Sequence, residues 1–279
     1  MCQLLGMNCN APTDVTFSFR GFAQRGGNTD HHADGWGIAF FEGNDVDESD
    51  AVVTTESDEV WGTTCDDRGL RHFVDHQAAS TSPVAALISR YPIKSRNVIS
   101  HIRKATQGRV ALENCHPFVR ELWGRYWVFA HNGDLKDFAP RLHGGFKPVG
   151  DTDSERAFCY IMQELAKSHA GVPSARELSI TLRELAAHIA PHGTFNFLLS
   201  NGQALWAHAS TNLYYVERKH PFAHATLSDE EVSVNFAEHT RLTDRVAVVV
   251  TAPLTTNESW TAFAPGEVKV FAAGVLTDF

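Results

Sequence analysis

The stretch Met1-Cys2-Gln3-Leu4-Leu5-Gly6-Met7-Asn8 places a thiol directly after the initiator methionine. Cysteine is small enough to permit methionine removal, and Cys2 would then carry a thiol and a free α-amine. Such an amine has an ordinary pKa of about 7.7–8.0, so it can take the thiol proton without a partner histidine. The alternative interpretation is a small buried residue in a first strand, which we expect over residues 2–7. The rest of the chain must decide between the two.

The composition is that of a folded globular protein. The chain has 279 residues, of which 43% are apolar, and it shows no repeat, low-complexity tract or linker. We therefore expect a single domain over residues 1–279. A formal net charge of -9 and a pI near 5.9 argue against a nucleic-acid surface. Apolar runs have strand length and the N-terminus has no leader pattern, so we expect a cytoplasmic protein without membrane segments.

The five cysteines are Cys2, Cys9, Cys65, Cys115 and Cys159. Their odd number and the lack of Cys-x-x-Cys spacing argue against a disulfide framework and a thiolate zinc site. The segment Asp30-His31-His32-Ala33-Asp34 has four possible metal ligands, but no further histidine or cysteine pair completes a shell. We expect no metal and no cofactor.

Hydrophobic patterning predicts both strands and helices. Residues 97–103 alternate between two faces, which puts His101 and Arg103 on the same side. The apolar stretch 126–130 predicts a buried strand that ends at His131-Asn132-Gly133-Asp134, where Asn-Gly is typical of an exposed turn.

Two helices are expected in the second half of the chain. Residues 151–155 open the first, with Asp153 at or beside its N-cap, and Ser174 caps a second that reaches about residue 190. A hairpin with its turn at Asn201-Gly202 follows, and further strands lead to the C-terminus. Long antiparallel strand runs with two central helices predict an α+β fold of packed sheets covered by helices.

Several polar residues could support attack by a Cys2 thiolate on an amide carbonyl. The tetrahedral oxyanion needs donors, and the Asn132 side chain with the Gly133 backbone N–H could supply two. Arg103 and Asp153 could bind the carboxylate and ammonium of an amino-acid substrate. Taken singly, Asn132-Gly133, Arg103 and Asp153 are more typical of a plain hairpin turn, a surface cation and an N-cap aspartate.

Seven motifs, taken together, are far more specific. They are Cys2, Arg25-Gly26, Asp34-Gly-Trp-Gly-Ile38, His101-Ile-Arg103-Lys-Ala-Thr106, Glu113-Asn-Cys-His-Pro-Phe118, His131-Asn132-Gly133 and Thr152-Asp153-Ser154-Glu155. In this order the chain resembles the class II glutamine amidotransferases of the stand-alone YafJ type, essentially from end to end.

The resemblance implies an N-terminal-nucleophile (Ntn) hydrolase with a four-layer αββα sandwich of two antiparallel sheets flanked by helices. It implies that Cys2 attacks the γ-carboxamide of glutamine and forms a γ-glutamyl thioester, with release of ammonia and then glutamate. Asn132 and Gly133 would hold the oxyanion.

The resemblance also assigns substrate-binding roles. Arg103 would bind the α-carboxylate, Asp153 the α-ammonium, and Thr106 would line the pocket through its backbone. Arg25 would steady the terminus from behind these residues. Residues 27–33 and Lys104 depart from the pattern of the synthetase-linked members, so the substrate is less well defined than the catalytic group.

Three functions remain open at this point. The chain ends at Phe279 without room for a synthetase domain, so a glutaminase would pass its ammonia to a separate protein. A γ-glutamyl hydrolase acting on a peptide or conjugate is the alternative enzyme. A glutamine-sensing module without chemistry is the third, and retention of Met1 would favour it.

Overall fold

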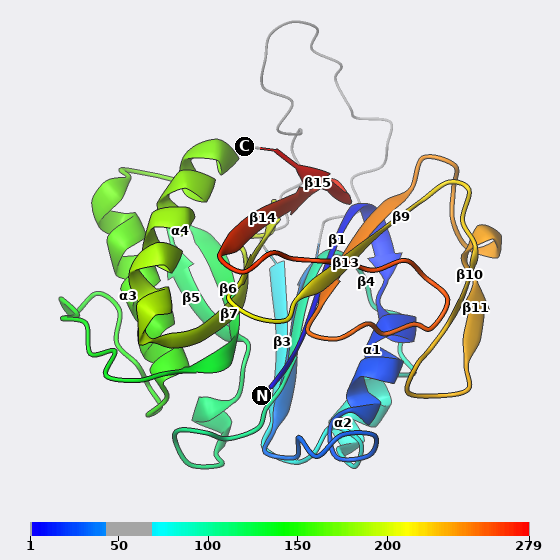
Figure 1. Ribbon diagram of the computed structural model, residues 1–279, viewed down its shortest axis with the longest axis horizontal. Coiled ribbons are helices and arrows are strands. Elements are labelled where there is room, and N and C mark those ends of the chain that lie inside the picture. Colours follow the sequence, from blue (N-terminus) through cyan, green and yellow to red (C-terminus); the bar gives the residue numbers. More distant parts are fainter. Residues whose placement is uncertain (1, 43–68, 279) are drawn as a thin grey trace, which may run out of the picture.

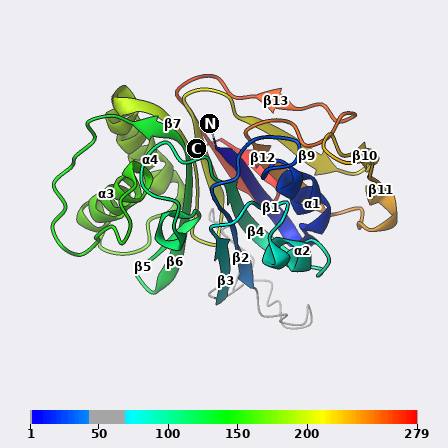
Figure 2. The same cartoon turned by 90° about the horizontal axis from the view of Figure 1, so that it is seen from below.

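The computed structural model describes residues 2–42 and 69–278. It contains two large antiparallel sheets that pack face to face, with helices on both outer surfaces (Figure 1, Figure 2). The first sheet has the order β13 (Thr261–Ala262), β9 (Tyr214–Lys219), β12 (Arg245–Val250), β1 (Gln3–Asp14), β4 (Lys94–Ile102), β2 (Trp36–Glu42), β3 (Gly69–Asp75). The second has the order β15 (Val275–Thr277), β14 (Glu267–Ala272), β8 (Leu205–Ala209), β7 (Gly193–Ser200), β6 (Arg125–Leu135), β5 (Phe118–Leu122). A small ribbon pairs β10 (His224–Thr226) with β11 (Ser233–Asn235).

Three apolar clusters separate the four layers. One packs α1 (Thr16–Gln24) and α2 (Pro83–Ile88) on the first sheet, and another packs α3 (Asp153–Ser168) and α4 (Ala175–Ile189) on the second. The third lies between the sheets. In β1, Leu5 belongs to the helix-facing cluster and Leu4 to the middle one, as strand alternation requires. The expected four-layer αββα fold is confirmed.

The sheets approach closely at Gly6, which faces the second sheet. A Cβ at this position would lie 2.8 Å from Leu205 Cδ2. The glycine in the opening stretch of sequence therefore allows β1, in the middle of the first sheet, to approach the second sheet closely.

Both predicted helix starts are confirmed. The Thr152 side chain accepts a hydrogen bond from the Glu155 N–H (3.2 Å), so Asp153 is the first helical residue of α3. Ser174 and Glu177 form a reciprocal capping box at the start of α4. Within the described residues, no helix has the length and apolar character needed to cross a membrane.

The predicted turn at Asn132-Gly133 is wrong. β6 continues to Leu135 and pairs with β7, so that Asn132 lies opposite Asn196 and Gly133 opposite Phe195. Asn132 is fully buried. Asn-Gly has a different use here, because a Cβ on Gly133 would lie 1.7 Å from the Thr194 carbonyl oxygen. Glycine is therefore needed for close strand approach, and strand pairing overrides the local turn preference. The hairpin at Asn201-Gly202 is confirmed by pairing of β7 with β8.

Candidate active site

The middle core ends in a set of polar residues. Among its members, from four central strands, are Leu4, Ile99, Ala130 and Val249. Two residues further toward the same end of the sandwich lie Cys2, His101, Asn132 and Thr251. Because side chains alternate along a strand, these four belong to the same inner faces as the apolar residues. The sheets thus converge on a polar end at the start of β1.

The Cys2 thiol is held by the backbone of the segment that follows β4. Gln3 pairs with Ile102 across the two strands, and Cys2 Sγ accepts the Lys104 N–H (3.3 Å) and donates to the Lys104 carbonyl (3.4 Å). Burial raises the pKa of the Cys2 thiol, while the Lys104 N–H and the Arg103 charge lower it and the Asp153 charge raises it. The thiol is therefore protonated near neutral pH, and a reaction through the thiolate would require a base.

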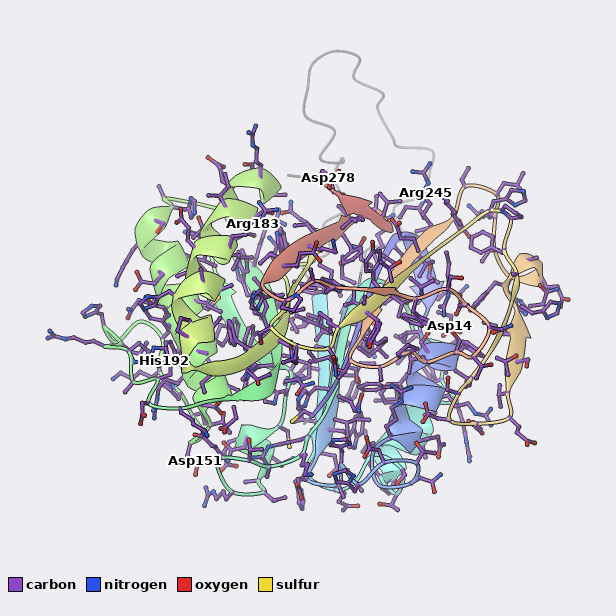
Figure 3. All side chains as sticks on the ribbon, viewed as in Figure 1. Asp14, Asp151, Arg183, His192, Arg245 and Asp278 are labelled. Atoms are coloured by element: carbon purple, nitrogen blue, oxygen red, sulfur yellow. The ribbon has the colours of Figure 1, made fainter. Side chains whose placement is uncertain are left out.

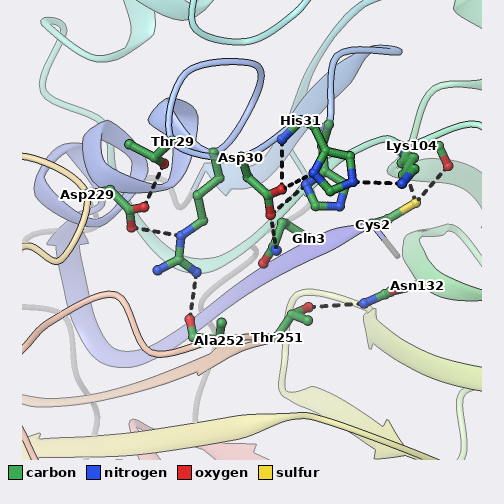
Figure 4. Close-up of polar contacts among 12 residues, drawn as sticks. Cys2, Gln3, Thr29, Asp30, His31, Lys104, Asn132, Asp229, Thr251 and Ala252 are labelled. Carbon is green, nitrogen blue, oxygen red and sulfur yellow. Dashed lines mark hydrogen bonds and ion pairs between the residues drawn. The ribbon is translucent and has the colours of Figure 1, made fainter.

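Asn132 and Gly133 offer two donors at this end. Asn132 Nδ2 donates to Thr251 Oγ1 (3.3 Å), and this contact links the two sheets (Figure 4). The direction of the Gly133 N–H follows from strand alternation. The N–H of Leu135, two residues on, donates to Asp153 Oδ2 (2.8 Å), and the N–H of Phe195, opposite Gly133, donates to Ser210 Oγ. The Gly133 N–H is thus directed away from β7, toward the edge that carries Asp153.

Arg103 is buried beside the thiol and organises the next loop. Its guanidinium donates to the carbonyls of Gln107 (2.9 Å), Gly108 (3.3 Å) and Arg109 (3.1 Å). Thr106 lies in this loop and is exposed, and no contact joins it to Cys2 within the described residues. Arg103 therefore fixes the position of the loop that contains Thr106.

Asp153 is buried at the first turn of α3. One carboxylate oxygen takes the Leu135 N–H, and the other lies 3.4 Å from the Ser154 hydroxyl. Ser154 also contacts His131 Nδ1 (2.8 Å). One Asp153 oxygen is consequently committed to the strand, while the other has only a long contact.

In the part of the chain that the structure describes, no contact joins Arg25 to Cys2, either directly or through a shared partner. It forms a buried ion pair with Asp229 (2.8 Å) and donates to the carbonyl of Ala252 (2.7 Å) (Figure 4). It also donates to the carbonyl of Pro253. These carbonyls directly follow Thr251. Any support that Arg25 gives the terminus is therefore indirect.

The segment considered for metal ligands lies beside the thiol. Asp30, His31 and His32 have donor atoms within 4.8 Å of one another. The Asp30 carboxylate contacts Nδ1 of both imidazoles at 2.8 Å, and Lys104 Nζ lies 2.7 Å from His31 Nε2. The four described cysteines are free and buried, and Cys65 lies outside the described residues.

Three buried histidines lie inward of the candidate site. The rings of His101 and His116 are 4.1 Å apart between centroids. Burial lowers the pKa of His101, His116 and His131, and for His101 the nearby His131 acts in the same direction. All three imidazoles are neutral in the folded protein near neutral pH.

This cluster predicts acid sensitivity. Below the ordinary histidine pKa of about 6.5, these imidazoles bind protons in the unfolded chain but not in the folded chain. Stability is thus fully present above that pH and falls as pH decreases, by up to about 1.4 kcal/mol per pH unit for each imidazole. Urea unfolding at pH 7.5, 6.5 and 5.5 measures the slope. His76→Gln, at an exposed side chain, should leave the slope unchanged, and a flat profile in the wild type would contradict the prediction.

A separate hollow of about 610 Å³ lies between α4 and the β14–β15 edge. Its lining includes Arg183, Glu267, Lys269 and Asp278. Figure 3 places Arg183 and Asp278 at the end where the chain terminates, whereas β1 starts at the opposite end (Figure 1). This hollow is therefore not part of the candidate site.

Sequence reasoning missed two residues that shape the site. Thr251 follows the apolar run of β12 and bonds both Leu4 and Asn132. Asp34 accepts the Ala105 N–H (2.8 Å) and so holds the segment after Arg103. The polar residue at the end of a valine run was the available signal for Thr251. The sequence places Asp34 in a motif and among the possible metal ligands, but gives no sign that it holds this segment.

Comparison with known proteins gives consistent results along the whole chain. The family profile described as "Glutamine amidotransferases class-II" matches residues 1–279. A provisionally named glutamine amidotransferase of Haemophilus influenzae is 48% identical over 98% of this chain and 85% of its own length. The provisionally named glutamine amidotransferase YafJ of Escherichia coli is 44% identical over 98% of each chain. A crystal structure of a predicted glutamine amidotransferase from Pseudomonas aeruginosa aligns over 100% of both chains with 39% identity and a TM-score of 0.74.

Proposed function

The chain belongs to the class II glutamine amidotransferases, and from this premise we propose that it hydrolyses the γ-amide of glutamine through a thioester on Cys2. The observation that carries the proposal is the placement of the thiol. Cys2 lies between the N–H and carbonyl of Lys104, and the charges of Arg103 and Asp153 both act on its pKa.

The first half of the reaction forms the thioester. Removal of Met1, which lies outside the described residues, gives Cys2 a free amine that takes the thiol proton. The sulfur attacks the γ-carbonyl carbon, and the oxyanion accepts hydrogen bonds from Asn132 Nδ2 and the Gly133 N–H. The amine then returns the proton to the departing nitrogen, the C–N bond breaks, and ammonia leaves.

The second half restores the thiol. The amine takes a proton from water, the hydroxide oxygen attacks the thioester carbonyl, and the C–S bond breaks as the thiol is reprotonated. Glutamate then leaves. During both halves Arg103 would bind the substrate α-carboxylate beside the 107–109 loop, and Asp153 Oδ1, which has only the long contact with Ser154, would accept a hydrogen bond from the α-ammonium.

The test measures glutamate and ammonia from L-glutamine, using protein whose N-terminus has been verified by intact mass. We expect equal amounts of the two products, with free ammonia when no acceptor protein is supplied. A parallel assay with γ-glutamyl dipeptides tests the alternative hydrolase. Glutamate released from the dipeptides alone would show that the substrate is a γ-glutamyl compound and not glutamine. No glutamate from either compound would exclude γ-glutamyl hydrolysis by this protein.

A further inference from the structure

We infer that Thr251 is a positioning residue that holds the Asn132 amide in register with the strand bearing Cys2. This inference rests on the proposed function, because the amide acts as an oxyanion donor there. Thr251 follows β12 and is 8% exposed. Its hydroxyl oxygen accepts hydrogen bonds from the Leu4 N–H (2.9 Å) and from Asn132 Nδ2 (3.3 Å).

Among the described residues, the Asn132 side chain forms no other hydrogen bond. It is fully buried, its Oδ1 has no hydrogen-bond partner within the described residues, and its Nδ2 contacts Thr251 alone there. The torsion that rotates an amide about its last bond is broad, so packing alone fixes it weakly. The Thr251 oxygen has two lone pairs, so it can accept the Leu4 N–H and one N–H of the Asn132 amide NH2 group. One N–H of Asn132 is thereby fixed, and the second is left for the oxyanion.

Thr251 is in turn fixed to the nucleophile strand. Its own N–H donates to the Leu4 carbonyl (3.2 Å), so backbone and side chain together bind both polar groups of Leu4. Leu4 is two residues from Cys2. One hydroxyl therefore couples the position of the thiol to the orientation of an amide on the opposite sheet.

The segment after Thr251 is anchored independently. Arg25 donates to the carbonyls of Ala252 and Pro253 and pairs with Asp229. This anchor gives Arg25 a route to the site through Thr251. It also means that loss of the Thr251 hydroxyl should leave the backbone in place.

The experiment compares Thr251→Val, which keeps the shape without the hydroxyl, with Thr251→Ser, which keeps the hydroxyl. We expect Thr251→Val to lower kcat for glutamine by roughly 10- to 100-fold with little change in KM, below the 10²–10³-fold typical for complete loss of an oxyanion donor. Thr251→Ser should retain most of kcat. Thr255→Val is the matched control, because this buried hydroxyl contacts Glu258 and Trp260 instead. It should lower the Tm comparably and leave kcat unchanged.

A double-mutant cycle separates positioning from a structural effect. In an Asn132→Ala background, Thr251→Val should lower kcat by less than about threefold. The effects of two contacting residues that act through one another are not additive. Two results would overturn the inference while the wild type still hydrolyses glutamine. One is a decrease in kcat caused by Thr251→Val that is as large in the Asn132→Ala background as in the wild type, and the other is an unchanged kcat in the Thr251→Val single variant. Absence of hydrolysis by the processed wild type would instead overturn the proposed function and this inference together.

Discussion

Cys2→Ala is expected to lower glutamine hydrolysis by roughly 10⁴-fold or more, because removing a nucleophile leaves only binding and oxyanion stabilisation. The fold should survive. Cys2 precedes β1, and within residues 2–42 and 69–278 its Sγ hydrogen-bonds the Lys104 backbone alone. Glutamate release and urea unfolding, measured on the same preparation, check both halves of the prediction.

Cys9→Ala is the matched control for this variant. Cys9 is a buried free thiol on the same strand, and burial raises its pKa to about 12. The Cys9→Ala variant should lose some stability and keep its glutamine-hydrolysing activity. A second comparison uses wild-type protein that retains Met1, in which the thiol has no amine on its own residue and should be inactive. Substantial turnover by Cys2→Ala would exclude the thioester mechanism.

Much of the fold could be predicted from local patterns. The starts of α3 and α4 depend on capping residues within one turn, and the β7–β8 hairpin depends on two residues at its tip. Such signals survive because they involve neighbours in sequence. The strand and helix pattern predicted packed sheets covered by helices, and the four-layer arrangement was implied by the family resemblance.

The extent of β6 could not be predicted in this way. Asn132-Gly133 carries the same local signal as Asn201-Gly202, and only the second pair is a turn. The difference lies in β7, which pairs with β6 as far as Leu135 and brings the Thr194 carbonyl against Gly133. A contact between residues about 60 positions apart leaves no trace in a local window.

The sequence predicted the residues of the candidate site better than the hydrogen bonds between them. Cys2, Arg103, Asn132 and Asp153 are brought to one end of the sandwich, and their roles remain proposals. Thr251 was missed because its importance comes from two partners on two other strands, Leu4 and Asn132. Periodicity reveals which face a residue belongs to, but not which polar atoms meet across two sheets.

Gly133→Ala should be the most destabilising single substitution in the site, at about 3 kcal/mol or more, because overpacking against a backbone cannot be relieved by a rotamer change. The added Cβ would lie 1.7 Å from the Thr194 carbonyl oxygen and 2.5 Å from His131 Nε2. β6 and β7 would have to separate there. That movement would displace the Gly133 N–H, so glutamine hydrolysis should fall with stability.

Gly145→Ala provides the matched control, since a Cβ at Gly145 would have no heavy atom within 4 Å. Its stability should change by no more than about 0.5 kcal/mol, the usual range for an exposed substitution. Urea unfolding of the two variants, together with glutamate release at a temperature where both are folded, separates the effects. If Gly133→Ala unfolds like the control, the close approach of β6 to β7 is wrong. If it is destabilised yet fully active when folded, the Gly133 N–H is not an oxyanion donor, and Asn132 must act without it.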